Sequence, residues 1–264
     1  MHLLIVEGNK RETWLERQQA GILPYHQRFE QMIEKLNADA TVEVAFPADE
    51  KSELPTASQL SKYDGVLWTG SGLCVNASDS AVHRQLEFAE EIFESGVPFY
   101  GSCWGLQVAT VVAGGKVGAC AKGREFGITS PIQLTKPGEG HRYFKNRKSN
   151  YQALCIHSDE VVEPAPNTTV VAYNDHSAVQ AAIIQYKNSE FFGVQYHPEF
   201  LAEDMHSIAV HMKEKLLSDG TFNSESDFES FISRLENSDA LPAEISNYSL
   251  HTLDVKNWLD SLPA

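Results

Sequence analysis

One cysteine of this 264-residue chain has the surroundings of a nucleophile. Residues 97–100 form an apolar run that leads into a Gly-Ser-Cys-Trp-Gly motif centred on Cys103, and a helix-like segment follows. Gly101 and Gly105 lack the Cβ atoms that would collide in a sharp strand-to-helix turn. Such a turn places the thiol at a helix N-terminus, where backbone N–H groups and the helix dipole favour the thiolate. The motif therefore predicts a cysteine nucleophile, against the alternative of a buried, inert cysteine.

A histidine and a carboxylate further along the chain could complete this chemistry. His197 and Glu199 flank Pro198, directly after an apolar β run over residues 191–196. Side chains two apart in an extended chain point the same way, and proline removes a ladder donor, so both should lie where the strand ends. A histidine can take the thiol proton and return it to a leaving amine, while a carboxylate fixes its orientation. The pattern indicates a Cys-His-Glu triad, although a surface turn is the alternative.

These residues resemble the class I glutamine amidotransferases, in particular GMP synthase amidotransferase domains and γ-glutamyl peptidases, over roughly residues 3–200. Four segments carry the resemblance in chain order: the Cys103 motif with Gln107, residues 124–128, residues 157–161, and His197-Pro198-Glu199. The resemblance implies that Cys103 attacks the γ-carboxamide of glutamine and that His197 protonates the departing ammonia. Glu199 would orient His197, and water would then hydrolyse the thioester to glutamate.

The same resemblance implies an oxyanion hole and two substrate contacts. In the family, backbone N–H groups after the nucleophile and in a glycine loop after the third strand stabilise the developing oxyanion. Trp104 and the loop Gly70-Ser71-Gly72 match these positions. Relatives often carry Gly-Gly-Pro in that loop, so the sequence leaves the donor within it open. Gln107 and His157 are implied to contact the substrate, while Asp159 is implied to be a neighbour of the site.

Apolar runs alternate with helix-like segments in the first half of the chain. We expect strands at residues 3–6, 41–46, 65–69 and 97–100, helices from Pro24 and over residues 80–95, and a polar loop over residues 9–23. This alternation predicts an α/β fold, a doubly wound and mostly parallel sheet with helices on both faces. Ligands of such sheets bind beyond the carboxyl ends of the strands, where the candidate residues fall.

The second half predicts two additions to this sheet. Short β runs at residues 128–134, 151–156, 169–173, 178–185 and 191–196 predict added hairpins. The last 64 residues hold 12 acidic and 4 basic side chains and show rough helical spacing of apolar residues. We therefore expect an amidotransferase-like domain over residues 1–200 and an acidic, helical extension over residues 201–264. The extension either packs on its own domain or docks a partner.

Composition excludes several kinds of protein. Twenty-one basic against 36 acidic residues give a net charge of −15, which argues against a nucleic-acid partner. Apolar stretches are too short for a membrane helix, and no signal-like segment precedes Leu3, so we expect a cytoplasmic protein. The four cysteines contain no Cys-x-x-Cys pair, which indicates free thiols.

Motifs for cofactors and metals are incomplete. The Gly70-Ser71-Gly72 loop lacks the third glycine of a dinucleotide fingerprint, and Gly118 and Gly123 lack the Lys-Ser/Thr of a P-loop. His206 and His211 are awkwardly spaced for a metal site on one helical face. We therefore expect neither a cofactor nor a metal.

Three functions remain open. The chain could hydrolyse glutamine and supply ammonia to a separate synthase partner, because it carries no acceptor-binding module of its own. It could be a γ-glutamyl peptidase or hydrolase, which would need an open cleft around Trp104 and residues 9–23 for a larger leaving group. It could also be a non-catalytic module that senses glutamine or binds a partner, although the complete Cys-His-Glu set argues against this.

Overall fold

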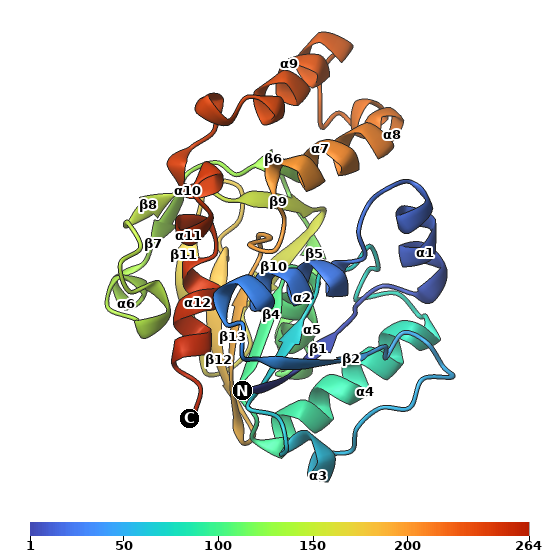
Figure 1. Cartoon of the computed structure of the whole chain (residues 1–264), viewed down its shortest axis with the longest axis vertical. Helices are drawn as coiled ribbons and strands as arrows, with labels where there is room; N and C mark the ends of the chain where they lie inside the picture. The colour runs from blue at the N-terminus through green and yellow to red at the C-terminus, as the bar shows by residue number, and fades with distance from the viewer. Residues whose placement is uncertain (264) are drawn as a thin grey trace.

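The computed structural model describes residues 1–263 and is built around a nine-stranded sheet in the order β2-β1-β3-β4-β13-β12-β11-β7-β8 (Figure 1). Its first half is parallel and consists of β2 (Thr41–Ala45), β1 (His2–Val6), β3 (Gly65–Trp68), β4 (Phe99–Ser102) and β13 (Ser189–Val194). The non-sequential order of these strands is that of a doubly wound sheet, as predicted.

Antiparallel strands extend the sheet beyond β13. They are β12 (Ala181–Tyr186), β11 (Thr168–Tyr173), β7 (Ile132–Leu134) and β8 (Asn150–Tyr151). Two small sheets stand beside it, one pairing β5 (Lys116–Ala119) with β10 (Asp159–Glu163) and one pairing β6 (Glu125–Ile128) with β9 (Leu154–His157). Consecutive strands β11, β12 and β13 form hairpins as expected, whereas the two small sheets pair strands that are far apart in the sequence.

Helices cover both faces of the sheet because its central strands are apolar on both sides. Leu3 and Ile5 of β1 face α2 (Tyr25–Leu36) and α12 (Leu253–Asp260). Leu4 and Val6 face the opposite core, which contains α4 (Ser80–Ser95) and α5 (Trp104–Val112). Such strands read as unbroken apolar runs, which is why β1 could be predicted from four consecutive residues.

The caps of α4 follow from local chemistry. The side chain of Asp79 accepts a hydrogen bond from the N–H of Ala81, and Gly96 ends the helix with φ of 80°. Only glycine adopts this left-handed conformation freely. The helix expected over residues 80–95 is confirmed.

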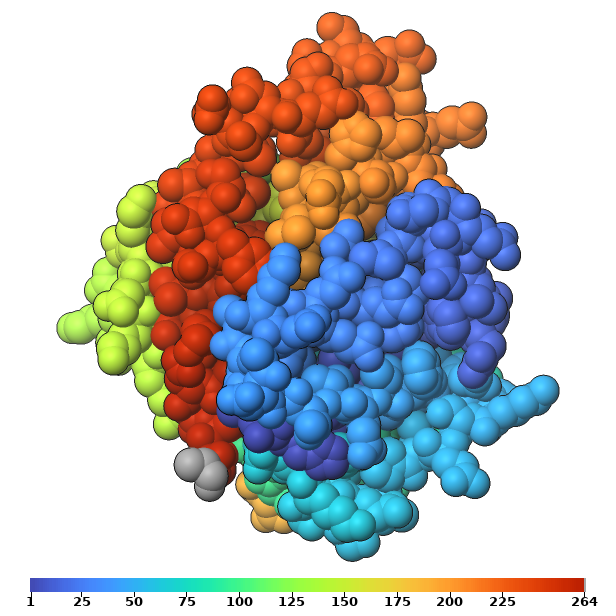
Figure 2. All heavy atoms as spheres, in the orientation of Figure 1, coloured from blue at the N-terminus to red at the C-terminus, as the bar shows by residue number. Residues whose placement is uncertain are grey.

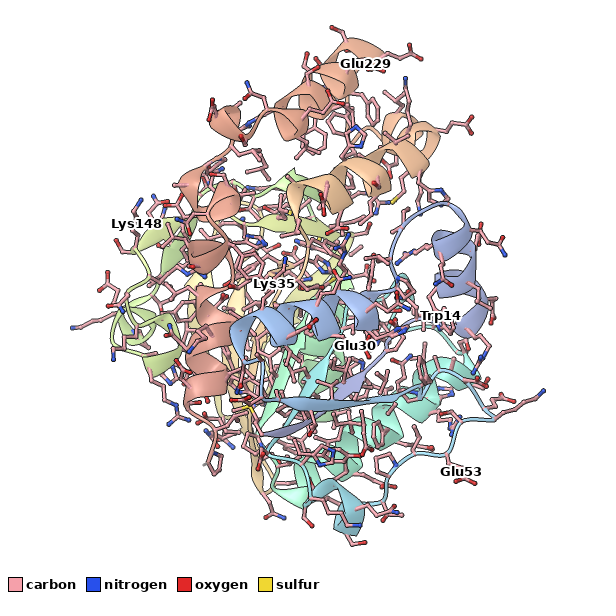
Figure 3. The ribbon with its side chains drawn as sticks, in the orientation of Figure 1. Trp14, Glu30, Lys35, Glu53, Lys148 and Glu229 are labelled. Carbon is pink, nitrogen blue, oxygen red and sulfur yellow. The ribbon has the colours of Figure 1, made fainter. Side chains whose placement is uncertain are left out.

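The expected polar loop over residues 9–23 is wrong, because α1 occupies Arg11–Gln19. This helix has no buried residue and therefore lacks the apolar stripe by which a helix is recognised in a sequence. Its glutamate, arginine, glutamine and leucine residues are good helix formers. Trp14 attaches the helix to the domain by packing against His26 and Phe46, with ring centroids 5.6 and 6.1 Å away (Figure 3).

Several expected strands have different bounds, and the run expected over residues 151–156 is divided between β8 and β9, which belong to different sheets. The run over residues 128–134 is interrupted: β6 ends at Ile128, β7 starts at Ile132, and the two belong to different sheets. Pro131 in the gap has no N–H for a ladder. The strand expected over residues 97–100 is β4, which starts one residue after Pro98 and continues to Ser102.

The region after β13 is helical, as the composition indicated. It comprises α7 (Ala202–His211), α8 (Lys213–Ser218), α9 (Glu225–Glu236), α10 (Ala243–Ser246), α11 (Tyr248–His251) and α12. The short α3 (Ala57–Leu60) and α6 (Lys136–Glu139) complete the helices outside it, with two 3-10 turns at Arg142–Phe144 and Ser238–Ala240. No helix within residues 1–263 is both long and apolar enough to cross a membrane.

The last helices pack on the sheet rather than extending away from it. Trp258 of α12 is fully buried and lies 5.6 Å from the ring of Tyr100. Lys35 of α2 lies over the ring of Tyr248 at 4.9 Å, which joins α2 to α11 (Figure 3). The C-terminal helix therefore contributes directly to the core of the α/β domain.

A buried ion pair holds α12 in place. Nη2 of Arg147 donates to Asp254 at 2.8 Å, and both side chains are almost completely buried. The hydroxyl of Tyr196 donates to the other Asp254 oxygen at 2.5 Å and lies 3.0 Å from the hydroxyl of Tyr151. Arg147 also donates to the carbonyl of Leu250 at 2.7 Å. This network joins the C-terminal helix to residues next to β8 and β13.

We predict that Asp254→Asn destabilises the protein by about 3–5 kcal/mol, because it leaves the charge of Arg147 buried without a counterion. Urea unfolding followed by circular dichroism measures this change. The matched control is Asp260→Asn in the same helix, whose partner Lys256 is exposed, and which should change the free energy of unfolding little. Equal changes in the free energy of unfolding would show that the buried ion pair stabilises the protein no more than the exposed pair does.

Candidate active site

Cys103 lies in the sharp turn between β4 and α5. Its φ of 48° and ψ of −97° are a strained conformation for a residue with a side chain. A Cβ on Gly101 would lie 2.8 Å from the carbonyl carbon of Gly105, and a Cβ on Gly105 would lie 3.0 Å from the carbonyl oxygen of Trp68. Gly101 is thus needed for β4 and α5 to cross, Gly105 is needed for α5 to pack on β3, and the thiol is presented where α5 begins.

His197 and Glu199 follow the end of β13. Nδ1 of His197 donates to Oε1 of Glu199 at 2.6 Å, and the same oxygen accepts from the hydroxyl of Ser102 at 3.2 Å. The ring of Phe200 stacks on His197 with centroids 4.3 Å apart. Within the described chain, Nε2 of His197 has no hydrogen-bond partner, and His197 and Cys103 line one pocket. The structure therefore brings the three predicted residues together.

Electrostatics favour a protonated His197. Burial alone would lower the pKa of this imidazole, since the ring is almost completely buried. The negative charges of Glu199 and of the Cys103 thiolate outweigh burial and raise the pKa of His197 to about 10. At neutral pH the imidazolium is therefore the favoured form, and it can stabilise a thiolate beside it.

The loop Gly70-Ser71-Gly72 passes over the histidine. A Cβ on Gly70 would lie 2.6 Å from Cε1 of His197, so a larger residue does not fit there. The N–H of Gly72 is engaged, because it donates to Oδ1 of Asn9 at 3.0 Å. Asn9 is itself held by Glu7, whose carboxylate accepts from its N–H and its side-chain amide at 2.9 Å. This arrangement favours the Gly70–Ser71 part of the loop for binding an oxyanion.

Trp104 lies on the other side of the nucleophile. Its indole is fully buried and donates to the side-chain oxygen of Gln85 at 2.8 Å, while Gln85 donates to the carbonyl of Gly8 at 3.1 Å. As the first residue of α5, Trp104 has a backbone N–H without a partner inside the helix. The indole fixes the turn, and the N–H at the helix start can bind a negative charge.

Gln107 and His157 line the same pocket, but part of their hydrogen-bonding capacity is used within the protein. The amide nitrogen of Gln107 donates to the carbonyl of Asp159 at 3.0 Å. Nε2 of His157 donates to Glu125 at 2.9 Å, and its Nδ1 lies 3.4 Å from Sγ of Cys120. Both side chains therefore hold β9 and β10 in place at the pocket wall, in addition to any contact that they make with a substrate.

The other cysteines have different environments. Burial raises the pKa of Cys155 well above its usual value and that of Cys120 to about 12. Partial burial also raises the pKa of the exposed Cys74. These three thiols are therefore protonated at neutral pH.

Metal-ligating side chains meet in one region next to the site. Ligand atoms of Cys120, Glu160 and His176 lie within 4.8 Å of one another, as do those of Glu125, His157 and His176. In the second group the carboxylate of Glu125 already accepts hydrogen bonds from His157, Asn174 and Gln180 at 2.7–2.9 Å. That group is satisfied as a hydrogen-bond network. Of the histidines set aside in the sequence, His206 pairs with Glu236 at 3.3 Å, whereas His211 lines the pocket.

A pocket of about 520 Å³ opens above Cys103. Its walls include α1, the loop around residues 71–74, and β9–β10, and its rim includes α7 and α8 (Figure 2 shows the N-terminal segment in blue beside the orange α7–α8 segment). Several lining residues escaped sequence reasoning, among them Arg17, Tyr25, Ile208 and Lys215. No local motif marks them, since they come from segments remote from Cys103 in the sequence.

Comparisons with known proteins agree with this geometry. A family model described as glutamine amidotransferase class-I matches residues 23–212. A γ-glutamyl-L-1-hydroxyisopropylamide hydrolase of Pseudomonas sp. is 32% identical over 99% of this chain and 93% of its own length. A glutamine-hydrolysing GMP synthase of Fusobacterium nucleatum is 32% identical, but over 41% of this chain and 20% of its own length.

The fold is also that of solved structures. A glutamine amidotransferase of Thermotoga maritima superposes with a TM-score of 0.69 over 98% of this chain and 96% of its own, at 18% sequence identity. The family model covers most of the chain, and the Pseudomonas relative aligns along nearly its whole length. The chain therefore belongs to the class I glutamine amidotransferase family.

Proposed function

We propose that the protein hydrolyses γ-glutamyl amides through a thioester on Cys103, with His197 and Glu199 completing a catalytic triad. The observation that carries this proposal is the meeting of three features in one pocket. Cys103 occupies a strained turn at a helix start, Nε2 of His197 is unpartnered within the described residues, and Nδ1 of His197 is 2.6 Å from Glu199. This is the arrangement that nucleophilic acyl transfer needs.

The proposed reaction has two halves. The thiolate of Cys103 attacks the γ-carbonyl carbon, and N–H groups of Trp104 and the Gly70–Ser71 segment stabilise the oxyanion. One such donor is worth about 3–4 kcal/mol. The C–N bond then breaks as His197 gives its proton to the leaving amine. Water next attacks the thioester, His197 takes a proton from it, and the C–S bond breaks to release glutamate. Neither half requires a cofactor.

We further propose that the leaving amine is larger than ammonia. The Pseudomonas relative, which aligns over 93% of its length, is named as a hydrolase of a γ-glutamyl alkylamide. The pocket volume of about 520 Å³ falls in the range of sites that hold drug-sized ligands. Residues of α1 form part of the pocket wall, so the position of this helix limits the size of the leaving group that fits.

A glutaminase that supplies ammonia to a separate synthase partner is the second candidate. It is favoured by the similarity to a GMP synthase, of which this chain matches 20%. Its substrate would be glutamine itself, so turnover measurements separate it from the first candidate. A non-catalytic glutamine-binding module would bind without turning over.

Turnover of the purified protein is the first test. Glutamine and γ-glutamylethylamide are offered side by side, and we expect higher kcat/KM for the ethylamide. Cys103→Ala should lower kcat by about 10⁴-fold or more, because it removes the nucleophile. Cys155→Ala, which removes a buried thiol outside the pocket, is the matched control. A preference for glutamine would support the glutaminase, and turnover by Cys103→Ala would exclude the triad.

Thiol reactivity tests the nucleophile independently of any substrate. We expect iodoacetamide at pH 7 to alkylate Cys103 faster than Cys74, although Cys74 is the exposed one, because the imidazolium of His197 stabilises the Cys103 thiolate. Peptide mass spectrometry over a time course gives the four rates. Alkylation of Cys74 at the same rate as Cys103 would argue against an activated nucleophile.

The pH profile tests the role of Glu199. Activity should fall as pH rises through the His197 pKa of about 10, because the proton needed by the leaving amine is lost. Glu199→Gln removes the charge that raises this pKa, so the alkaline limb of kcat/KM should move to lower pH and kcat should fall by up to about 10⁴-fold. The control is Glu203→Gln, an exposed change in α7. An unmoved alkaline limb would refute the assigned role.

A further inference from the structure

The pocket contains a basic side chain, Arg17, that has no anionic partner within the described residues. Arg17 projects from α1, and within the described residues it forms no ion pair, while its buried Nη1 has no hydrogen-bond partner. Its guanidinium carbon lies 4.7 Å from the ring centroid of Tyr25, and its Nη2 would lie 3.5 Å from a Cβ on Gly72. A buried guanidinium donor without an acceptor is unfavourable, so this position suits a bound anion.

Other arginine guanidinium groups of the described chain have an acceptor, either a carboxylate or, for Arg84 and Arg234, a backbone carbonyl. Arg124 lines the same pocket but pairs with Asp219 at 2.9 Å. Arg147 pairs with Asp254, and Arg28 pairs with Asp204. Glu16 and Asp159 line the same pocket, but within residues 1–263 no carboxylate forms an ion pair with Arg17.

The position of Arg17 relative to His197 indicates which part of a substrate it meets. In the proposed reaction His197 must reach the leaving nitrogen. The ring of Tyr25 stands edge-on to His197, with centroids 6.1 Å apart. The guanidinium carbon of Arg17 lies 4.7 Å from the centroid of the same tyrosine ring. The leaving group therefore extends from His197 towards Tyr25 and Arg17. Gln107 and Asp159, from α5 and β10, also line the pocket and are joined by a hydrogen bond of 3.0 Å.

A second basic side chain, Lys215, adds positive charge to the pocket. Lys215 of α8 lines the pocket and forms no ion pair within residues 1–263. An arginine binds a carboxylate through two parallel hydrogen bonds, whereas a lysine contributes a more mobile point charge. Arg17 is therefore the specific contact, and Lys215 adds to the local positive potential.

We propose that Arg17 binds a carboxylate of the leaving amine, so that among the γ-glutamyl amides with a leaving amine larger than ammonia, those of amino acids and peptides are cleaved faster than those of neutral amines such as ethylamine. This inference rests on the proposed hydrolysis at Cys103. It assigns Arg17 as a specificity-determining residue and α1 as the element that supplies it.

A matched substrate pair tests this assignment. γ-Glutamylglycine and γ-glutamylglycinamide differ at one terminal group, a carboxylate against a neutral amide. We expect the wild-type protein to favour γ-glutamylglycine in kcat/KM by roughly 10- to 100-fold, the range for one hydrogen-bonded charge. Arg17→Gln should remove this preference. Arg11→Gln is the control, since Arg11 lies on the same helix but pairs with Asp49 outside this pocket.

The contradicting outcomes are distinct. An equal loss of activity on both substrates would place Arg17 on the α-carboxylate of the glutamyl group and overturn the proposal. Retention of the preference in Arg17→Gln would exclude any contact with the leaving group.

Binding separates this inference from the proposed function. If no γ-glutamyl compound is turned over, hydrolysis at Cys103 is refuted. Calorimetric titration of Cys103→Ala with both compounds still measures recognition by Arg17, because no reaction is needed. We expect Cys103→Ala to bind γ-glutamylglycine more tightly than the amide, and the double variant with Arg17→Gln to bind both equally. Equal binding by Cys103→Ala itself would refute the role of Arg17.

Discussion

The close approach of Gly101 and Gly105 is the steric constraint on which the site depends. It allows β4 and α5 to cross without a Cβ between them, and it holds Cys103 in its strained backbone conformation. The N–H of Cys103 donates to the carbonyl of Val194 at 2.7 Å, so the same turn is bonded to β13. Because β13 leads directly to His197, one turn fixes both the nucleophile and the strand that delivers its partner.

Hydrogen bonds between buried polar groups hold the glycine loop that lines the pocket. The carboxylate of Glu7, fully buried at the end of β1, accepts from Asn9 and from Nδ1 of His26 at 2.8 Å. Asn9 in turn fixes Gly72. Buried polar side chains of this kind are stable only when each finds a partner. The glycine loop above His197 is thus supported by the carboxyl ends of the parallel strands.

Features that depend on a few neighbouring residues could be predicted from the sequence, whereas features that depend on residues far apart in the chain could not. The elbow around Cys103 and the meeting of His197 with Glu199 follow from glycine sterics and from a two-residue spacing, which short motifs record. Helix α1 could not be found in this way, because none of its residues is buried and no apolar period marks it. Arg17 was missed with it. The separation of β6 from β7 was also missed, since the choice of a partner strand is made by distant residues.

The packing of Trp258 has a consequence for how the chain folds. A Cβ on Gly65 of β3 would lie 2.8 Å from the indole of Trp258, so the last helix closes tightly over a strand near the beginning of the chain. The part of the sheet face that α12 covers stays exposed until α12 has been synthesised. Contacts this distant in sequence are slow to form, and an unfinished sheet exposes apolar surface. Completion of the core therefore waits for α12, and shortened chains that lack this helix are expected to aggregate.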